Sequence, residues 1–352
     1  MLKQCGLPLT GKKSIKISRL ETHIKEAQKL CLKRYAYKQS IPLTDLSAKI
    51  TSRDVPTICA EAVPNQVVSI DIGYRNMAFI HMTRDRQILD WKHVELLPNS
   101  SYEPWEVSKK IREFVTQLLP KIDCTQGSYI IEHQRFRTNG GSAVSNSIML
   151  TNVIEALIYS NLGLHDSHVD AINPAAVSAY LDLPALSNKY QESLNNADLL
   201  WTLSQKNKTK KSSRLSASRH RFKKKIAIAI VDSWLNGVGN DIESSTMETT
   251  TTKKDTKKPK GRSKTPPPTD LELPQPLVKI GYNDEENNLV QWRQYFELQK
   301  KKDDLSDCLL QAMVWLDWQV HTVGLLKDLT KIVGLKLLLR AIKDEPQLPS
   351  QQ

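Results

Sequence analysis

Acidic residues stand at three places in this chain where carboxylates are uncommon. Asp71 interrupts the apolar and β-branched stretch VVSIDIGYRN, and Glu132 falls near the end of a similar run, SYIIEH. A third group, Asp303, Asp304 and Asp307, lies in KKDDLSDCLLQAMVWLDW. An unpaired charge in a buried strand is costly unless something compensates for its lost hydration. A metal ion is one such compensation, and the simpler alternative for the first acid is a carboxylate that caps the turn after its strand.

The third group of acids shares one helix face. Asp304 and Asp307 are spaced i, i+3, while Asp303 and Asp307 are spaced i, i+4. Acids in a first helical turn also favour the helix macrodipole, which explains them if they are taken alone. Combined with the two strand acids, however, they would gather four carboxylates in one small space. Such a group is tolerable only with divalent cations between its members, and hard oxygen ligands select Mg²⁺ or Mn²⁺.

Two such ions can activate a water molecule and stabilise the leaving oxygen when a phosphodiester is cleaved in line. Basic residues flank every acidic position, as they should if the substrate is a polyanion. Each could be an ordinary surface charge, but their repetition indicates phosphate contacts. They are Arg75 after the first acid, Arg135 and Arg137 after the second, and Lys301 and Lys302 before the third.

The composition agrees with a nucleic acid partner. The chain has 352 residues, of which 39% are hydrophobic, so it can form one large domain or two ordinary ones. Its net charge of +12 favours a polyanion, with nucleic acid ahead of an anionic membrane. No run of apolar residues is long enough for a membrane span. The five scattered cysteines include no CxxC pair, which argues against a zinc ribbon or a disulfide scaffold and favours a reducing compartment.

The elements that must position the acids indicate an α/β fold. Three β-type runs joined by short links predict an antiparallel meander. A helix, a fourth strand, an apolar helix, a fifth strand and a helix start at Pro174 follow. This order predicts a mixed β-sheet flanked by helices. The expected ranges are 67–72, 77–83 and 88–97 for the meander, 105–122 for the first helix, 128–133 for the fourth strand, 148–162 for the second helix and 170–173 for the fifth strand.

The second half of the chain is uneven. A basic tract at 206–225 runs into a predicted helix at 226–235, and residues 237–276 hold low-complexity runs of Thr, Ser, Lys and Pro that predict a disordered insertion. Structure is expected to resume near Leu289. A helix at 303–318 and a separate leucine-rich amphipathic helix at 323–342 are predicted to close the chain.

The first 35 residues form a unit of their own in the sequence. Their apolar residues are broken by glycines, which predicts two short helices joined by GLPLTGKK. This segment resembles the SAP motif, a helix–extended loop–helix DNA-binding element, and lysines beside a helix N-terminus suit phosphate contacts. A basic start without acids is equally typical of a mitochondrial targeting segment. The residues that match the motif are Gly6, Leu7, Pro8, Gly11, Lys12 and Lys13. Residues 36–64 are expected to be a connector.

The motifs SIDIGYRN, IIEHQRFR and KKDDLSD, in this order, resemble the fungal mitochondrial Holliday junction resolvases, which are relatives of bacterial RuvC in the ribonuclease H-like superfamily. The resemblance covers residues 65–320 and the SAP-like element, and it implies a ribonuclease H-like resolvase domain over 65–345. It also implies that Asp71, Glu132, Asp307 and either Asp304 or Asp303 bind the metals. The i, i+3 spacing of RuvC favours Asp304 over Asp303.

Two features depart from the family pattern. His133 stands where members have Arg in a Glu-Arg-Gln-Arg run, and the insertion at 237–276 is longer than in compact members. The candidate DNA-binding residues are Lys12, Lys13, Arg75, Asn76, Gln134, Arg135, Arg137, Lys301 and Lys302.

The resemblance implies a Mg²⁺-dependent endonuclease, with Mn²⁺ as a substitute, that nicks opposed strands of a four-way DNA junction in the mitochondrial matrix. A two-fold substrate asks for two identical sites, which a homodimer supplies, and residues 148–162 are a candidate contact face. No membrane and no nucleotide cofactor are expected. The competing functions are a nuclease of the same superfamily that acts on RNA hybrids or flaps, a non-catalytic DNA-binding protein, and an actin-like or sugar-kinase ATPase. The last class needs a second glycine-rich phosphate loop, which a chain with 13 glycines does not offer.

Overall fold

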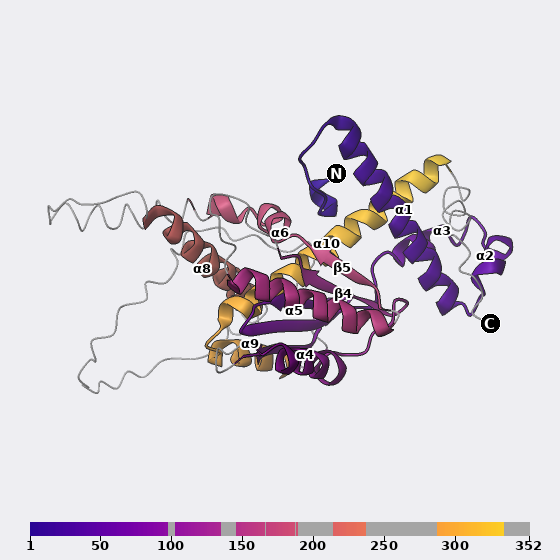
Figure 1. Cartoon of the computed structure of the whole chain (residues 1–352). Helices are drawn as coiled ribbons and strands as arrows, with labels where there is room; N and C mark the ends of the chain where they lie inside the picture. The colour runs from indigo at the N-terminus through magenta and orange to yellow at the C-terminus, as the bar shows by residue number, and fades with distance from the viewer. Residues whose placement is uncertain are drawn as a thin grey trace, which may run out of the picture.

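The structure is a computed structural model that describes residues 1–97, 103–134, 146–165, 167–186, 188, 214–236 and 287–333. Within these residues the chain is built on a five-stranded sheet in the order β3-β2-β1-β4-β5 (Figure 1). β1 to β3 form an antiparallel meander, and β4 and β5 extend the sheet in parallel with β1. The predicted mixed α/β sheet is therefore confirmed. The strands are β1 (Gln66–Ile72), β2 (Asn76–Thr83), β3 (Ile88–Glu95), β4 (Gly127–Glu132) and β5 (Val169–Ile172).

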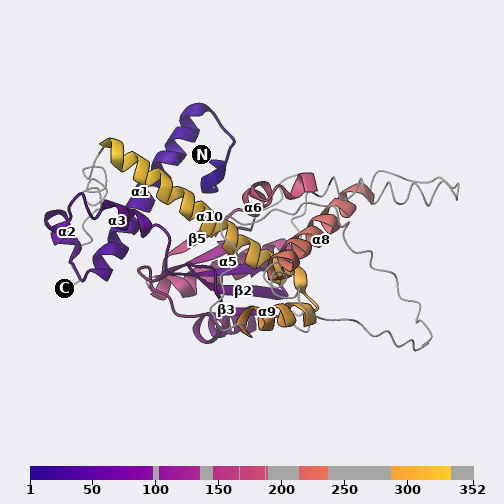
Figure 2. The ribbon, with the colours of Figure 1, turned by 180° about the vertical axis from the view of Figure 1, so that it is seen from behind.

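Helices cover both faces of the sheet. α6, α8, α9 and the long helix α10 lie on one face, and α4 and α5 lie on the other (Figures 1 and 2). Alternation along the strands produces these two faces, because successive side chains of a strand point to opposite sides. The helical elements are η1 (Lys3–Cys5), α1 (Lys13–Lys38), α2 (Leu43–Lys49), α3 (Val55–Ala60), α4 (Pro104–Glu113), η2 (Phe114–Leu118), α5 (Asn146–Leu162), η3 (Gly163–His165), α6 (Pro174–Tyr180), α8 (Arg214–Asn236), α9 (Asn287–Leu298) and α10 (Lys302–Val333).

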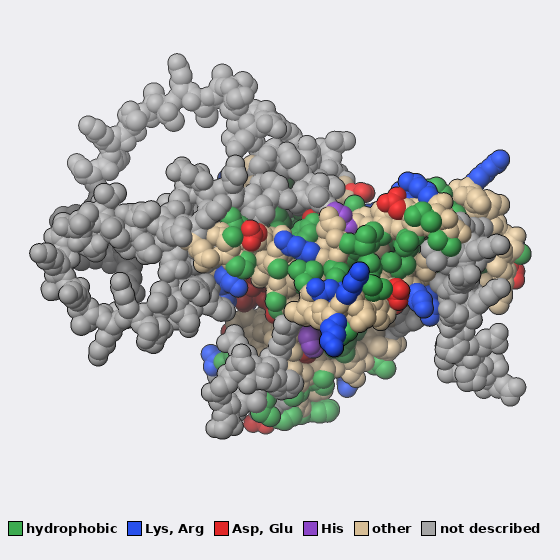
Figure 3. All heavy atoms as spheres, turned by 90° about the horizontal axis from the view of Figure 1, so that it is seen from above, with side chains coloured by type: hydrophobic (Ala, Val, Ile, Leu, Met, Phe, Trp, Pro, Cys, Tyr) green, Lys and Arg blue, Asp and Glu red, His purple; other side chains and the backbone are tan. Residues whose placement is uncertain are grey.

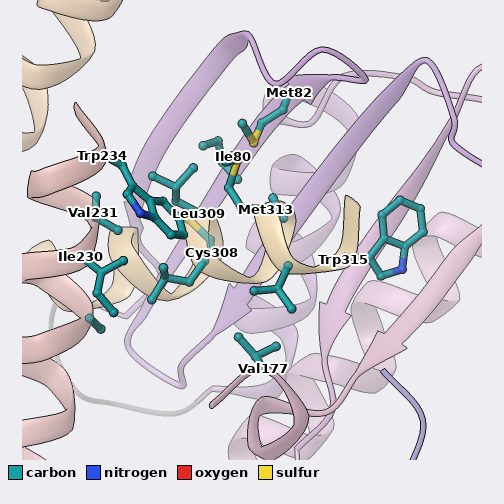
Figure 4. Close-up of a cluster of buried hydrophobic side chains, with 14 of the residues drawn as sticks. Ile80, Met82, Val177, Ile230, Val231, Trp234, Cys308, Leu309, Met313 and Trp315 are labelled. Atoms are coloured by element: carbon teal, nitrogen blue, oxygen red, sulfur yellow. The ribbon is translucent and has the colours of Figure 1, made fainter. Parts of the chain in front are cut away.

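A dense apolar core holds α10 against the sheet (Figure 4). Leu309 and Met313 of α10 belong to one buried cluster with Ile80 of β2 and Trp234 of α8. Burying a large apolar side chain contributes about 1.5–3 kcal/mol, so this cluster strongly fixes the position of α10. Its register matters for function because the third group of acids lies in the first turns of this helix.

A buried ion pair fixes the middle of α10. Arg86, in the turn between β2 and β3, donates from Nη2 to Asp317 Oδ1 at 2.6 Å, and both side chains are 2% exposed. The hydroxyl of Tyr180 donates to the other oxygen of Asp317 at 3.3 Å. A buried charge needs such partners, because an uncompensated one is strongly destabilising.

The N-terminal helices form a third cluster around the C-terminal half of α10. Cys31 and Leu32 of α1 are buried with Ile58 of α3 and with Leu326 of α10. Gly6, which has a φ of +69°, packs so closely on α10 that an added Cβ would come within 2.2 Å of the Trp318 ring. Residues 1–60 are therefore packed onto the same body as the sheet.

Arg34 ties this N-terminal block to the sheet. Its guanidinium is 1% exposed and donates to the carbonyl oxygens of Glu61, Ala62 and Cys124 and to the hydroxyl of Ser128 on β4. One side chain thus satisfies acceptors from three separate segments. A neutral replacement would remove all of these hydrogen bonds at once, including those to the buried carbonyl groups of Glu61 and Ala62.

We expect Arg34→Met to lower the free energy of unfolding of the full chain by about 3 kcal/mol, because an unsatisfied buried polar group costs about 1–3 kcal/mol and several are created at once. Urea denaturation followed by circular dichroism measures the change. Lys25→Met is the matched control on an exposed face of α1, and equal stabilities of the two variants would contradict the role of Arg34.

Three predicted elements differ in the structure. The prediction of two short N-terminal helices is wrong. η1 is a single turn, whereas α1 runs for 26 residues because residues 12–41 contain neither Gly nor Pro. The two separate helices predicted at 303–318 and 323–342 are one continuous helix over the described residues, because a single glycine, Gly324, weakens a helix without ending it. The helix predicted at 105–122 ends as α4 at Glu113 and continues as the π-helical turn η2.

Residues 36–64, expected as a connector, hold the end of α1 together with α2 and α3. The predicted disordered insertion at 237–276, most of the basic tract and residues 334–342 lie outside the described residues. None of the described helices is both long and apolar enough to cross a membrane.

Candidate active site

The register of the sheet places the two strand acids side by side. Asp71 on β1 lies opposite Ala78 on β2, which in turn lies opposite His93 on β3. On the other side, the parallel register of β1 with β4 brings Glu132 next to Asp71, and the two carboxyl groups are hydrogen-bonded to each other. The result is one row of four residues that runs across four strands on the face covered by α10.

The start of α10 brings the third group of acids to this row. Asp304 and Asp307 occupy its first two turns, and Gln311 follows one turn later. The Gln311 amide donates from Nε2 to Glu132 Oε2 at 2.9 Å and accepts from the Ser69 hydroxyl at 3.2 Å. This buried amide therefore fixes the register of α10 relative to β1 and β4, and with it the position of the acids.

Burial and mutual repulsion disturb the carboxyl groups of this cluster. Burial is the largest cause of the raised pKa of Asp71, and the charges of Glu132 and Asp307 add to it. Burial also raises the pKa of Glu132, although its hydrogen bonds with Asp71 and Gln311 oppose the shift. The hydrogen bond between the two strand acids adds to the raised pKa of Asp71 and lowers that of Glu132.

The helix acids respond in the same way. Burial, together with the charge of Glu132, raises the pKa of Asp307 to about 7. Burial, together with the charge of Asp303, raises the pKa of Asp304. Ionising all four groups at once is therefore unfavourable, and a positive charge between them would relieve the repulsion.

Asp303 behaves differently from Asp304 because it is bound to a lysine of α8. Lys224 donates from Nζ to Asp303 Oδ2 at 2.6 Å. Burial opposes ionisation of Asp303, but this hydrogen bond and the lysine charge outweigh it and lower its pKa. Asp304 instead points towards His93, with 3.7 Å between its Oδ2 and the imidazole Nε2.

Three residues of the site, Gln311, His93 and Lys224, were not singled out by the sequence patterns. Gln311 was detectable in principle, because it follows Asp307 at i+4 on one helix face. His93 required the exact register of the meander. Lys224 was only one of ten lysines and arginines in its tract, and nothing in the sequence separated it from the others.

Some of the predicted DNA-binding residues are exposed, and others make contacts within the protein. Lys12, Lys13, Arg75 and Lys301 are exposed. Gln134 donates from its amide to the carbonyl of Ile72 at 3.3 Å and so ties the end of β4 to β1. The remaining residues are Asn76, which begins β2, Lys302, which lies over the Phe296 ring, and Arg135 and Arg137, which fall outside the described residues.

Two further details surround the acids. Gly73 forms the β1–β2 turn, where an added Cβ would lie 2.5 Å from the carbonyl oxygen of Asn76, so a glycine is required. His133, which departs from the family pattern, is paired through Nδ1 with Glu155 at 3.3 Å. It therefore faces α5 rather than the carboxylate cluster.

A cavity of about 330 Å³ opens beside the acids, between α6, α8 and α10. Glu132 and Asp307 lie on its wall with Gln311, and Lys224 stands at the same cavity. Its remaining wall is largely apolar. This space lets a phosphodiester approach the carboxylates while a lysine offers a counter-charge.

The donor set fits a divalent cation. Within the described part of the chain, no three His, Cys, Asp or Glu side chains are grouped closely enough to hold a metal ion as they stand. In this arrangement Lys224 balances the charge of Asp303. Carboxylate oxygens that cannot all ionise without a positive charge between them are suitable ligands for Mg²⁺ or Mn²⁺.

Comparisons with known proteins place the chain in a family. A family model described as mitochondrial resolvase Ydc2 / RNA splicing MRS1 matches residues 67–325, a range that includes all five acids. No curated protein matches the chain. A solved structure, that of the yeast mitochondrial Holliday junction resolvase Ydc2, shares 13% identity over 94% of this chain and 95% of its own, with a TM-score of 0.44.

Proposed function

We propose that this chain, which belongs to the family of the mitochondrial resolvase Ydc2 and the RNA-splicing protein MRS1, is a metal-dependent endonuclease that resolves four-way DNA junctions. The observation that carries the proposal is the meeting of Asp71 and Glu132 on neighbouring strands with Asp304 and Asp307 on α10. A protein that only binds nucleic acid has no need of four acids in one partly buried cluster, because carboxylates repel phosphates.

Each side chain has a distinct part in this chemistry. Asp71, Glu132, Asp304 and Asp307 would hold Mg²⁺, which supplies an activated water and charge stabilisation for the leaving oxygen. Gln311 orients Glu132 through its amide. Lys224 binds Asp303 and extends a positive charge towards Glu132 and Asp307, which suits the approach of a phosphate. Arg75 and Lys301 are exposed beside the cluster and would contact neighbouring phosphates.

The strongest competing function takes its support from the family name, which also includes RNA splicing. In that case the chain binds structured RNA without cutting it. Two further competing functions are cleavage of RNA hybrids or flaps and binding of DNA without catalysis. The meeting of four acids favours hydrolysis over binding alone.

A panel of labelled substrates tests the proposal: a four-way junction, linear duplex, a flap and an RNA–DNA hybrid, each with Mg²⁺ and with EDTA. We expect paired nicks in the junction only, and only with Mg²⁺. Equal cutting of linear duplex and junction would contradict junction resolution, and binding of RNA without any cleavage would favour the splicing function.

A two-fold junction needs two identical sites, so we propose a homodimer. α5 offers an exposed apolar face for the second copy: Met149 is 53% exposed, Val153 is 41% exposed, and Ala156 continues the same stripe. Sedimentation equilibrium of the full chain should show two copies, and Val153→Glu should shift them to monomers. A monomeric wild-type chain would contradict this assembly.

The N-terminal loop is proposed to contact a DNA arm. Lys12 and Lys13 begin α1, where the free backbone N–H groups also favour phosphate. Farther along the same helix, His23 bonds Thr322, which lies 15 residues after Asp307 and hence about 22 Å along α10 at about 1.5 Å per residue. We therefore expect α1 to meet DNA away from the cleaved bond. Lys and Arg side chains are spread over the face seen in Figure 3.

Replacing Lys12 and Lys13 together by Gln is expected to weaken junction binding in EDTA and to reduce the slope of log K against log salt by about 2, since each lost phosphate contact removes about 0.9. Fluorescence anisotropy between low and moderate salt measures the slope. Lys25→Gln, farther along α1, is the control, and an unchanged slope in the double variant would argue that this loop does not touch DNA.

Asp304 should contribute much more to the nicking rate than its neighbour Asp303. We expect Asp304→Asn to reduce nicking on the order of 10²–10³-fold, as for the loss of one electrostatic catalytic group. Asp303→Asn should retain most activity, because that carboxylate is bound by Lys224. Single-turnover nicking rates compare them, and a larger loss for Asp303→Asn would reverse the assignment.

The mitochondrial matrix is the proposed location, in line with the family description. We propose that residues 1–35 stay in the mature protein, because Cys31, Leu32 and Arg34 carry part of the core and Cys5 is buried on α10. Mass spectrometry of the mitochondrial protein tests this, and a mature chain that begins after Cys5 would contradict it.

A further inference from the structure

His93 is a polar residue of the active-site row to which neither the acids nor the family match assigns a role. It lies opposite Ala78, which lies opposite Asp71, so the imidazole and the first acid are two strands apart on one face. Alanine has the smallest side chain that keeps a Cβ, so no large side chain of β2 stands between them. The imidazole lies close to an acid of α10.

The imidazole is aimed at one particular acid. His93 Nε2 lies 3.7 Å from Asp304 Oδ2. This nitrogen is inaccessible to solvent and, among the residues that the structure describes, has no hydrogen-bond partner. A buried polar atom left without a partner costs about 1–3 kcal/mol, so its position calls for a partner when the site is assembled.

The surroundings hold the histidine in this position. Its backbone N–H donates to the hydroxyl of Tyr295 on α9 at 3.2 Å, which anchors this part of β3 to α9. Trp91, two residues earlier on the same face, stacks on Phe296 and donates from Nε1 to the carbonyl of Leu305 at the start of α10. The strand, α9 and the first turn of α10 are thus fixed together around the imidazole.

We propose that His93 is a positioning residue that holds Asp304 in place for metal binding by donating a hydrogen bond from Nε2 to its carboxylate. This inference rests on the proposed metal-dependent function and deepens it. Hydrogen bonds at a catalytic centre are often long before the site is loaded, and closing the gap from 3.7 Å to about 2.9 Å requires only side-chain adjustment. One carboxylate oxygen then stays with His93 and the other is free to bind the metal.

The arrangement gives the adjacent aspartates different orientations. Asp303 is bound by Lys224 of α8, and Asp304 would be bound by His93 of β3. The two side chains leave the first turn of α10 in different directions. Asp303 would therefore balance the charge of Lys224, and Asp304 would bind the metal.

Mn²⁺ binding to the full chain without DNA tests the proposal, measured by calorimetry. The variants are His93→Leu, which removes the donor, and His93→Gln, which keeps an N–H near the same place. His81→Leu is the matched control, because His81 lies on the neighbouring strand and points to the opposite face of the sheet, where it bonds with Gln66.

We expect His93→Leu to weaken Mn²⁺ binding about 10–100-fold, the usual effect of losing a residue that orients a ligand. His93→Gln should bind within a few-fold of wild type, and His81→Leu should match wild type. Wild-type affinity in His93→Leu would overturn the proposal, as would a Gln variant as weak as the Leu variant.

Two readouts separate the remaining outcomes. Electron spin-echo spectroscopy of bound Mn²⁺ should show no nitrogen coupling from an imidazole, whereas such a coupling would make His93 a direct ligand and overturn the positioning role. If wild type binds no Mn²⁺ at all, the proposed metal-dependent function fails together with this inference. If wild type binds Mn²⁺ and the His93 variants bind equally well, only this inference fails.

Discussion

Asp71→Asn is expected to abolish Mg²⁺-dependent nicking of a four-way junction while leaving junction binding in EDTA unchanged. The variant keeps the shape of the side chain but removes the carboxylate at the centre of the row formed with Glu132 and His93. A metal ion contributes several kcal/mol of transition-state stabilisation, and about 1.4 kcal/mol corresponds to a factor of ten. The rate should therefore fall on the order of 10³-fold or more.

The stability of the same variant distinguishes a catalytic role from a structural one. Burial and the charges of Glu132 and Asp307 raise the pKa of Asp71, so the ionised group is unfavourable in the metal-free protein. An amide removes that repulsion, and the unfolding temperature in EDTA should not fall. Asp90→Asn, on β3 and paired with Lys92, is the control for nicking and stability. A normal nicking rate in Asp71→Asn would show that the metal-site assignment is wrong.

The carboxylate cluster should make the metal-free chain less stable as the pH rises from about 4 to about 7. The pKa of Asp307 is raised to about 7, and those of Asp71, Glu132 and Asp304 are raised as well. Between the unfolded and folded pKa values, the folded state therefore binds more protons than the unfolded state. The stabilisation is complete below the unfolded pKa and is lost as the pH passes through the folded one.

The four acids contribute in the same direction, whereas burial lowers the pKa values of His23, His81 and His168, which oppose them in the same pH range. Each unit of raised pKa corresponds to about 1.4 kcal/mol, so the cluster by itself should cost the metal-free chain several kcal/mol across this window. The difference between wild type and a variant that lacks one of the acids isolates this contribution. Mg²⁺ should restore stability above pH 7, where the acids are ionised, and have little effect near pH 5, where protons compete for the ligands.

Differential scanning fluorimetry from about pH 4 to about pH 9, in EDTA and in Mg²⁺, measures both effects. Asp307→Asn removes one of the raised groups and should flatten the EDTA curve. If the EDTA curves of wild type and Asp307→Asn have the same slope, the picture of a repulsive carboxylate cluster is wrong.

The fold was largely predictable because its elements carry strong local patterns. The three strands of the meander, β4, α5, β5 and the start of α6 lie within a few residues of the predicted ranges. Their alternating or apolar runs are bounded by turn residues, and such signals depend on nearby residues only. The predicted helix boundaries were wrong where no local residue ends a helix. α1 contains no Gly or Pro, and α10 continues through Gly324.

The sequence by itself predicted the kind of chemistry, from Asp71 and Glu132 near strand ends, Asp304 and Asp307 at i, i+3, and a basic chain that would meet a polyanion. Tertiary structure decided how these acids meet. The register of β1 with β4 makes the strand acids neighbours, and the core under α10 sets the helix acids over them.

Only the tertiary structure distinguished Asp303 from Asp304, because their partners come from elements far away in sequence, Lys224 on α8 and His93 on β3. A single sequence holds no signal for such pairings, since they depend on how strands align and how helices cross. Residue types and spacing thus specify what an active site is made of, whereas packing specifies which members face one another.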